Sequence, residues 1–293
     1  MSSAVAAEMG LGQLGPSTVM QARVQDNARA VVGYAGGGPG PLRGAFLGAM
    51  EELQVLHLGL CSDEDSTTPT FAPAADESAA WLAVMAIDQL PDDWEYVGTD
   101  RQKVRDKIAR ALNLVREHDP STFEAINTII GRFLVARLEH FEGGSISSLI
   151  GAIWIALGPD RPVEEFAELI VHEYVHNALF LEDMVHGVFV DGEARLGEDD
   201  ALVTSAILKI PRGYDKAFHS AVVSAVLGEF QQRLGLHEKA ATSLEPLATT
   251  LIGLREKDEM LTDNGRRVLA ELEDWVGQSL LTKSLVEDSV GVR

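Results

Sequence analysis

Apolar residues recur at helical spacing along most of the chain, and this pattern predicts a protein that is mainly helical. The predicted helices cover residues 42–58, 81–90, 101–117, 121–130, 214–234, 237–255 and 265–280. Thr262 is the expected N-cap of the last of these helices, because a threonine hydroxyl can accept a hydrogen bond from a free backbone amide.

Two segments have the pattern of strands and stand directly before another helix. β-branched and aromatic residues predict strands over residues 132–141 and 146–157, separated by Gly143-Gly144-Ser145. A helix then begins near Asp160 and Pro162, which are typical helix-start residues, and extends to about Phe180. The sequence therefore predicts an α+β fold dominated by helices, with a small sheet beside this helix.

The ends of the chain and two loops complete the predicted organisation. Residues 1–30 are small and polar with weak periodicity, which predicts a flexible N-terminal segment. Residues 31–293 are expected to form a single helix-rich domain with its core over residues 100–280. Polar residues predict an exposed loop at 62–77, and residues 185–206, rich in glycine and acidic residues, are expected to form a loop or hairpin able to cover a site.

The strongly acidic composition of the chain limits which classes of molecule it can be expected to bind. Its 293 residues carry a formal net charge of −21, although 46% hydrophobic and 24% charged residues are ordinary for a globular protein. Such an acidic chain disfavours nucleic acids and anionic membranes as partners. The one cysteine, Cys61, allows no internal disulfide and is expected to be a small core residue. No secretory signal or membrane-spanning run is evident, so the expected location is the cytoplasm.

The helix after the strands contains the motif His172-Glu173-Tyr174-Val175-His176, which has the pattern HExxH. Residues four apart lie on one face of a helix, so His172 and His176 can bind one metal ion. Glu173 can then act on a metal-bound water without being a ligand. The alternative is two buried histidines that make ordinary hydrogen bonds. The order strand, short turn, HExxH helix is typical of a zincin-like core, in which an edge strand can pair with an extended peptide.

A catalytic metal needs a third protein ligand, and the sequence leaves several candidates. The metzincin extension is absent, because Leu179 and Glu182 stand where that pattern has glycine and histidine. Glu182 and Asp183 lie too far along the same helix to reach the metal. The remaining candidates are His219, which is favoured, and His186, Glu193 and Glu229.

Short motifs elsewhere in the chain match one family. The matching residues are Gly144-Ser145, residues 168–173, Asn177, Leu179, Pro211-Arg212, His219, Leu261-Thr262 and Gly265. On these residues the stretch from about Asp100 to Trp275 resembles the HExxH-motif domain found in gene clusters for ribosomally made, post-translationally modified peptides (RiPPs). Gly213 follows Arg212, whereas members often have a tryptophan and a second proline around Pro-Arg.

Members of this family are regarded as iron(II)- and 2-oxoglutarate-dependent peptide β-hydroxylases with a zincin-like fold. The resemblance implies three iron ligands, namely His172, His176 and His219. It implies that an arginine binds the far carboxylate of 2-oxoglutarate, with Arg212 preferred and Arg161 in reserve. Glu173 would orient a ligand or the substrate amide, and the partner would be a precursor peptide bound in an extended form.

The residues alone, without the resemblance, favour a zinc metallopeptidase. In that case zinc polarises the amide carbonyl and Glu173 is the general base that activates water. Histidine ligands suit zinc and iron equally, so spacing does not separate the two chemistries. A third possibility is a protein that binds peptide without turnover, and a buried Glu173 would favour it.

Overall fold

The computed structural model describes residues 15–37, 40–55, 59–60, 68–71, 99–135 and 142–290. By its internal contacts the chain forms two compact units. Met20–Val185 form the first, here named the sheet unit, and Met1–Val19 with His186–Arg293 form the second, the helical unit. The single domain predicted for residues 31–293 stays a prediction.

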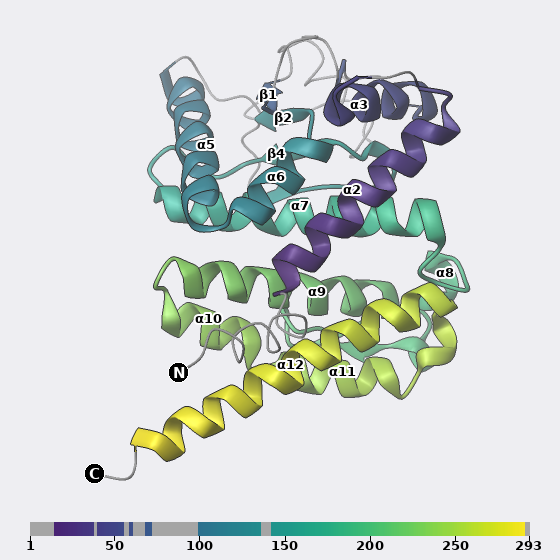
Figure 1. Cartoon of the computed structure of the whole chain (residues 1–293), viewed down its shortest axis with the longest axis vertical. Coiled ribbons are helices and arrows are strands. Elements are labelled where there is room, and N and C mark those ends of the chain that lie inside the picture. The colour runs from purple at the N-terminus through teal and green to yellow at the C-terminus, as the bar shows by residue number, and fades with distance from the viewer. Residues whose placement is uncertain are drawn as a thin grey trace, which may run out of the picture. The chain divides into compact units, whose positions relative to one another are not determined.

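Within the described residues, the sheet unit contains four short strands in the order β1-β2-β4-β3, and Figure 1 labels the first three of them. The strands are β1 (Thr70–Phe71), β2 (Arg132–Val135), β3 (Gly143–Gly144) and β4 (Ala152–Ile155). The first three in this order are parallel, whereas β3 runs antiparallel to β4. β2 and β4 are fully buried, as the run of apolar residues predicts for strands covered on both faces.

The strand prediction is correct for β2 and β4 but wrong between them. Gly143 and Gly144, predicted to break the strand, are themselves β3, and the next segment first forms a 3-10 turn at Ser147–Leu149. The reason is a close approach between backbone and side chain. A Cβ at Gly144 would overlap the indole of Trp154, and one at Gly143 would lie 2.8 Å from a methyl carbon of Leu169. Only glycine lets β3 pair with β4 at this place.

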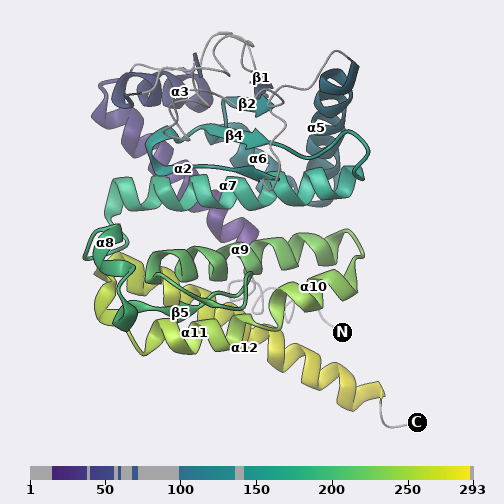
Figure 2. The same cartoon turned by 180° about the vertical axis from the view of Figure 1, so that it is seen from behind.

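In the part of the chain that the structure describes, five helices belong wholly or mainly to the sheet unit. They are α2 (Pro16–Tyr34), α3 (Leu42–Leu53), α5 (Thr99–His118), α6 (Pro120–Ile129) and α7 (Val163–His186). α7 runs along the sheet (Figures 1 and 2), and α6 begins after Asp119, whose buried carboxylate accepts a hydrogen bond from the Thr122 amide (3.1 Å). The helices predicted at 101–117 and 121–130 are confirmed, and the one at 42–58 ends earlier, at Leu53.

Some expectations for the N-terminal third cannot be followed in the structure. The helix predicted at 81–90, Cys61 and most of the loop predicted at 62–77 lie outside the described residues. The flexible segment predicted for residues 1–30 is wrong from Pro16 onward, because α2 begins there. Its first turn is held by Glu229, whose carboxylate accepts a hydrogen bond from the Ser17 amide at 3.0 Å. A distant side chain, rather than local periodicity, orders this helix.

The described residues of the helical unit form a two-stranded antiparallel sheet and four main helices. Its elements are α8 (Glu193–Leu196), β5 (Val203–Thr204), β6 (Pro211–Arg212), α9 (Tyr214–Arg233), α10 (His237–Leu244), α11 (Leu247–Arg255) and α12 (Asp263–Val290). Two 3-10 turns cover Asp199–Ala201 and Asp258–Met260. α9 packs against both α10 and α11. Among the described residues, no helix is long and apolar enough to cross a membrane.

The helices of this unit differ from the prediction at Pro246 and agree with it at Thr262. The single helix predicted at 237–255 is two helices, because Pro246 has no amide hydrogen to continue the first one. Thr262 is confirmed as the N-cap of α12, since its hydroxyl oxygen accepts a hydrogen bond from the Gly265 amide at 3.1 Å. The loop or hairpin predicted at 185–206 contains α8, a 3-10 turn and β5.

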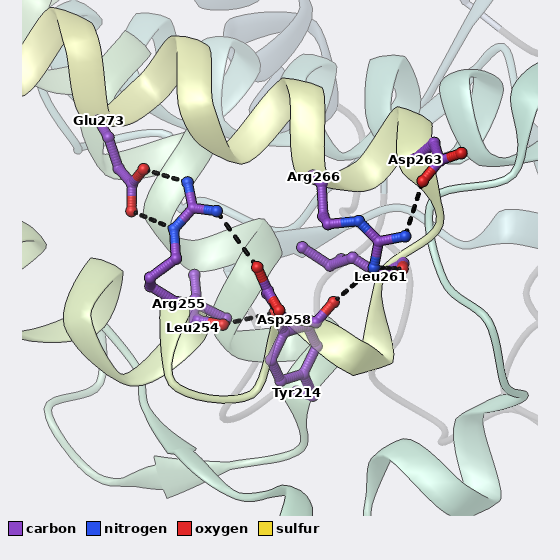
Figure 3. Close-up of polar contacts among 8 residues, drawn as sticks. All are labelled: Tyr214, Leu254, Arg255, Asp258, Leu261, Asp263, Arg266 and Glu273. Atoms are coloured by element: carbon purple, nitrogen blue, oxygen red, sulfur yellow. Dashed lines mark hydrogen bonds and ion pairs between the residues drawn. The ribbon is translucent and has the colours of Figure 1, made fainter.

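A polar network fixes the connection between α11 and α12 (Figure 3). Arg255 at the end of α11 pairs with Glu273 of α12, with Nε and Oε1 3.1 Å apart. Arg266 of α12 donates to the carbonyls of Asp258 (3.1 Å) and Leu261 (2.6 Å). Two arginines thus satisfy carbonyls and carboxylates in the turn, which holds the two helices in a defined orientation.

One buried carboxylate joins α2 to α7 within the sheet unit. Glu182 is 3% exposed, and its two oxygens accept hydrogen bonds from Arg23 Nη1 (2.7 Å) and Asn27 Nδ2 (2.7 Å). Such a carboxylate is stable in the interior only while both partners remain.

We expect Glu182→Ala to lower the free energy of unfolding by about 2–4 kcal/mol, because it removes the buried hydrogen bonds that Glu182 accepts from Arg23 and Asn27. Urea denaturation followed by circular dichroism measures this change. Asp26→Ala is the matched control, since it breaks the exposed ion pair with Arg29 and is expected to cost less than about 1 kcal/mol. Equal losses in the two variants would show that the Glu182 contacts do not hold α2 in place.

Candidate metal centre

The two histidines of the HExxH motif face each other on α7. His172 Nε2 and His176 Nε2 lie 3.1 Å apart, and the ring centroids are separated by 4.9 Å. Both side chains are half-buried. Phe180, one further turn along, stacks on His176 with a centroid distance of 6.2 Å. The face of α7 thus presents two imidazole nitrogens at one point, with an aromatic ring beside them.

The spacing of these nitrogens fits two ligands of one metal ion. Metal–nitrogen bonds of about 2.0–2.1 Å at angles between octahedral and tetrahedral place two nitrogens roughly 2.8–3.4 Å apart. Burial lowers the pKa of His172 to about 4, so this imidazole is neutral near pH 7, which is the form that binds metals. The same 3.1 Å contact is a hydrogen bond if one Nε2 carries the proton, as the alternative of ordinary buried histidines requires.

Glu173 is buried beside the pair and is held by a hydroxyl group. It is 6% exposed, and Ser145 Oγ donates to its Oε2 at 2.8 Å, while Oε1 lies 3.9 Å from His172 Nε2. Burial raises the pKa of Glu173 to about 7, and the hydrogen bond from Ser145 opposes this rise. A carboxyl group with this pKa can both accept and release a proton near neutral pH.

Ser145 follows β3, which is an outer strand of the sheet within the described residues. The backbone of Gly143 lies close to Leu169 of α7, so β3 runs beside the helix that carries the histidines. No local pattern in the sequence marks Ser145 as the partner of Glu173, because the two residues are 28 positions apart. The motif match named Ser145, but its contact with the carboxylate emerges only from the fold.

Asn177 connects α7 to the sheet next to the site. Its side chain is fully buried and accepts a hydrogen bond from the Gly151 amide at 2.9 Å. The same side chain donates to the carbonyls of Ala152 (3.3 Å) and Glu173 (3.0 Å). The helix is thereby bonded to the start of β4 through the residue that directly follows His176.

His219 and Arg212 belong to the helical unit, whereas the histidine pair belongs to the sheet unit. α9 begins at Tyr214, whose hydroxyl donates to the Leu254 carbonyl at 2.8 Å (Figure 3), and His219 follows in its second turn. His219 is 8% exposed and stacks on Phe189 with a centroid distance of 6.3 Å. Burial lowers the pKa of His219 to about 4, so its imidazole is also neutral at pH 7.

The three-histidine set stays a prediction. Among the described residues, no group of three or more His, Cys, Asp and Glu side chains is assembled to hold a metal ion. Within the sheet unit, the site consists of the paired imidazoles, the buried Glu173 and the hydroxyl of Ser145.

The other ligand candidates have different roles. His186 was expected in a loop, but it is the exposed last residue of α7, ten positions or about 15 Å beyond His176, so it cannot fold back onto the pair. Glu193 forms an exposed ion pair with Lys216 at 2.8 Å. Glu229 holds the Ser17 amide, as described above, and pairs with Arg233 at 2.6 Å.

The two candidate arginines differ in what surrounds them. Arg161 precedes α7, forms ion pairs with Glu142 (3.3 Å) and Glu165, and is separated from His172 by about 13 Å of helix. It is therefore not brought to the histidine pair. Arg212 lies in β6 and is half-buried, and its guanidinium has no hydrogen bond or ion pair with any described residue.

Comparison with known proteins assigns no family to this chain. No family model matches it, and a search of curated proteins finds no significant relative. The likeness to the peptide-modifying HExxH domain therefore remains a resemblance carried by the residues named above.

In metal-free protein, we expect the free energy of unfolding to depend on pH because the pKa of the buried Glu173 is raised. Its pKa is raised from about 4.5 to about 7, so the folded state retains a proton that the unfolded state releases. The free energy of unfolding should therefore fall as the pH rises from about 4.5 to 7, by roughly 2–4 kcal/mol, and stay low above that range. Glu173→Gln, which cannot ionise, should lack this fall and be more stable than the wild type at pH 8.

Urea denaturation at several pH values in the presence of a chelator measures the effect. Glu164→Gln is the control, because Glu164 is exposed in the first turn of the same helix and its loss should leave the pH dependence unchanged. Parallel pH profiles for the wild type and Glu173→Gln would contradict a raised pKa at Glu173.

Proposed function

We propose that this protein is an iron(II)- and 2-oxoglutarate-dependent hydroxylase that oxidises the β-carbon of a residue in a ribosomally made peptide. The observation that carries a metal site is the pair of imidazoles on α7, whose Nε2 atoms lie 3.1 Å apart and of which that of His172 is neutral near pH 7. The choice of oxidation over hydrolysis rests on Arg212 and on the family resemblance.

Three histidines hold the iron in this proposal. His172 and His176 supply two ligands from one helix, and His219 is the third because it is a buried, neutral imidazole on the well-packed helix α9. With 2-oxoglutarate bound, such a centre supplies the activation of dioxygen. The chain's own contribution is to present imidazole nitrogens, which are neutral in His172 and His219, and to pack an aromatic ring, Phe180, against His176.

Arg212 is the proposed partner of the far carboxylate of 2-oxoglutarate. An arginine matches a carboxylate with two parallel donors, and a half-buried guanidinium with no partner among the described residues is suited to bind one. A zinc peptidase has no need of this cation. Arg161, already paired with two carboxylates, is the less suitable candidate.

The peptide is proposed to bind along β3, in a zincin-like arrangement of α7, β4 and β3. β3 is short, runs antiparallel to β4 and lies beside α7, so an extended peptide can add to its outer edge by main-chain hydrogen bonds. Glu173 and Ser145 then lie between that edge and the histidines. In this role Glu173 positions the substrate amide and does not bind the metal.

A second candidate is a zinc peptidase, and the state of Glu173 favours it. A carboxyl group with a pKa of about 7 whose oxygen lies 3.9 Å from His172 Nε2 has the properties of a general base for a metal-bound water. The deep burial of the same group, at 6% exposure, favours the third class, a peptide-binding protein without turnover. The experiment below separates the three.

We expect metal-free protein, supplied with iron(II) and 2-oxoglutarate without oxygen, to develop the visible charge-transfer band of a chelated iron–keto-acid centre. His172→Ala should abolish the band, because it removes a ligand. Arg212→Ala should weaken it by raising the Kd for 2-oxoglutarate about tenfold or more, since a charge-assisted bidentate contact is lost. Arg161→Ala is the matched control and should leave the band unchanged.

Two other sets of results would contradict the hydroxylase function and support one of the alternatives. The absence of the band together with one tightly bound zinc in untreated protein, and peptide cleavage that Glu173→Gln abolishes, would establish the peptidase. Peptide binding with neither metal nor turnover would establish the non-catalytic class.

A further inference from the structure

The turn between β5 and β6 exposes several aliphatic side chains. This segment, Ser205–Ile210, is here named the hairpin tip. Ile207, Leu208 and Ile210 are 37%, 51% and 52% exposed, so three of its six side chains are large, apolar and open to solvent. Water contact with such side chains is unfavourable, and a contiguous apolar surface of this kind commonly marks an interaction site.

The hairpin tip has a defined conformation. Ser205 N donates to the Ile210 carbonyl and Lys209 N donates to the Ser205 carbonyl, both at 2.9 Å. Leu208 N donates to Ser205 Oγ at 3.3 Å. Lys209 adopts a left-handed backbone with φ of 57°, which an ordinary side chain adopts only when surrounding contacts require it. The exposed side chains are therefore presented in a fixed arrangement.

A further contact joins the hairpin tip to α9. Ser220 Oγ accepts a hydrogen bond from the Ala206 amide at 3.0 Å and donates to the Ala217 carbonyl at 2.7 Å. Ser220 is buried and directly follows His219. β6 leads from the tip through Arg212 into the same helix. The tip is thus connected, by this hydrogen bond and by β6, to the helix that carries His219 and the strand that carries Arg212.

The sequence of the hairpin itself differs in charge from the segments that flank it, which carry Asp199, Asp200 and Asp215. Residues 201–214 contain no aspartate or glutamate, and their only charged residues are Lys209 and Arg212. The chain as a whole has 45 acidic and 24 basic residues. This stretch is therefore apolar and locally cationic, which is complementary to a partner that carries both aliphatic and acidic side chains.

We propose that the hairpin tip is a docking surface for an aliphatic and acidic segment of the peptide substrate, outside the residue that is modified. The proposal rests on the proposed function only in taking the partner to be that peptide. Aliphatic side chains of the segment would cover Ile207, Leu208 and Ile210, and its carboxylates would lie near Lys209.

Two other occupants fit the observations less well. A second copy of the chain would bring together two molecules of net charge −21, and Pro211 removes an amide hydrogen from the strand that would pair between two hairpins. An anionic membrane is disfavoured by the same charge. A peptide of this kind does not carry the large negative charge of a second chain, and its side chains can contact the tip without strand pairing at Pro211.

The probe is a fluorescein-labelled synthetic peptide of alternating leucine and glutamate, and its binding to metal-free protein is measured by fluorescence anisotropy. Peptides with serine in place of leucine, or with lysine in place of glutamate, serve as references. We expect the leucine–glutamate peptide to bind at least about tenfold more tightly than either reference, because only it matches the surface in both apolarity and charge.

Variants test whether binding occurs at the hairpin tip. The double variant Leu208→Ser/Ile210→Ser should weaken binding about tenfold or more, and Lys209→Glu should weaken it and reverse its salt dependence. Ile252→Ser is the matched control, because Ile252 is a 62% exposed aliphatic residue on α11 of the same unit, and it should bind as the wild type does.

Several results would overturn the proposal. These are no binding of the leucine–glutamate peptide, equal binding by the double variant, a dimer in analytical ultracentrifugation that the double variant dissolves, or sedimentation with phosphatidylcholine vesicles that the double variant abolishes. His172→Ala separates this proposal from the proposed function. It should lose the iron band but retain peptide binding, whereas loss of binding in the double variant with an intact band would implicate the tip alone.

Discussion

The rotation of α7 about its axis determines what every residue of the HExxH motif can do, and a buried amide fixes that rotation. Asn177 bonds to the backbone at Gly151 and Ala152, so one stripe of the helix must face the start of β4. Glu173, one turn earlier, is drawn to the same side and meets Ser145. The histidines lie on the neighbouring stripe, about 100° round the helix, and are left half-exposed.

This arrangement keeps the site uncharged inside a strongly acidic protein. Burial disfavours the cationic form of His172 and the anionic form of Glu173, so near neutral pH the imidazole is neutral and the carboxyl group is partly protonated. A bound cation would therefore be the dominant charge of the site and would set the ionisation of its neighbours. Local burial, and not the net charge of −21, governs the chemistry available on α7.

The local pattern of the sequence was sufficient to predict the long helices and to predict that two histidines on one helix lie close together. The periodicity of α5, α7 and α9 and the spacing of His172 and His176 depend on residues close in sequence, so each could be predicted. β3 could not be predicted in this way, because its two glycines are required by an indole ten positions away in the paired strand.

Long-range contacts also explain the other errors. α2 is ordered by Glu229 and Glu182, which are more than 150 positions away. The hydrogen bond from Ser145 to Glu173 likewise depends on tertiary structure. The contacts that occupy the candidate ligands Glu193 and Glu229 do so as well. Pro246 is different, since its breaking effect was visible in the sequence and was outweighed by the continuous helical pattern around it.

Pro211 disfavours the pairing of a further strand with the hairpin that carries the exposed aliphatic side chains. An exposed aliphatic segment beside a strand is a template for uncontrolled strand addition and fibril growth. In β6 the proline removes one amide hydrogen, and Thr250 Oγ1 donates to the Thr204 carbonyl at 2.8 Å, which occupies an acceptor on β5. Each edge of the hairpin therefore offers one hydrogen-bonding group fewer, which disfavours the addition of a further strand beside its apolar side chains.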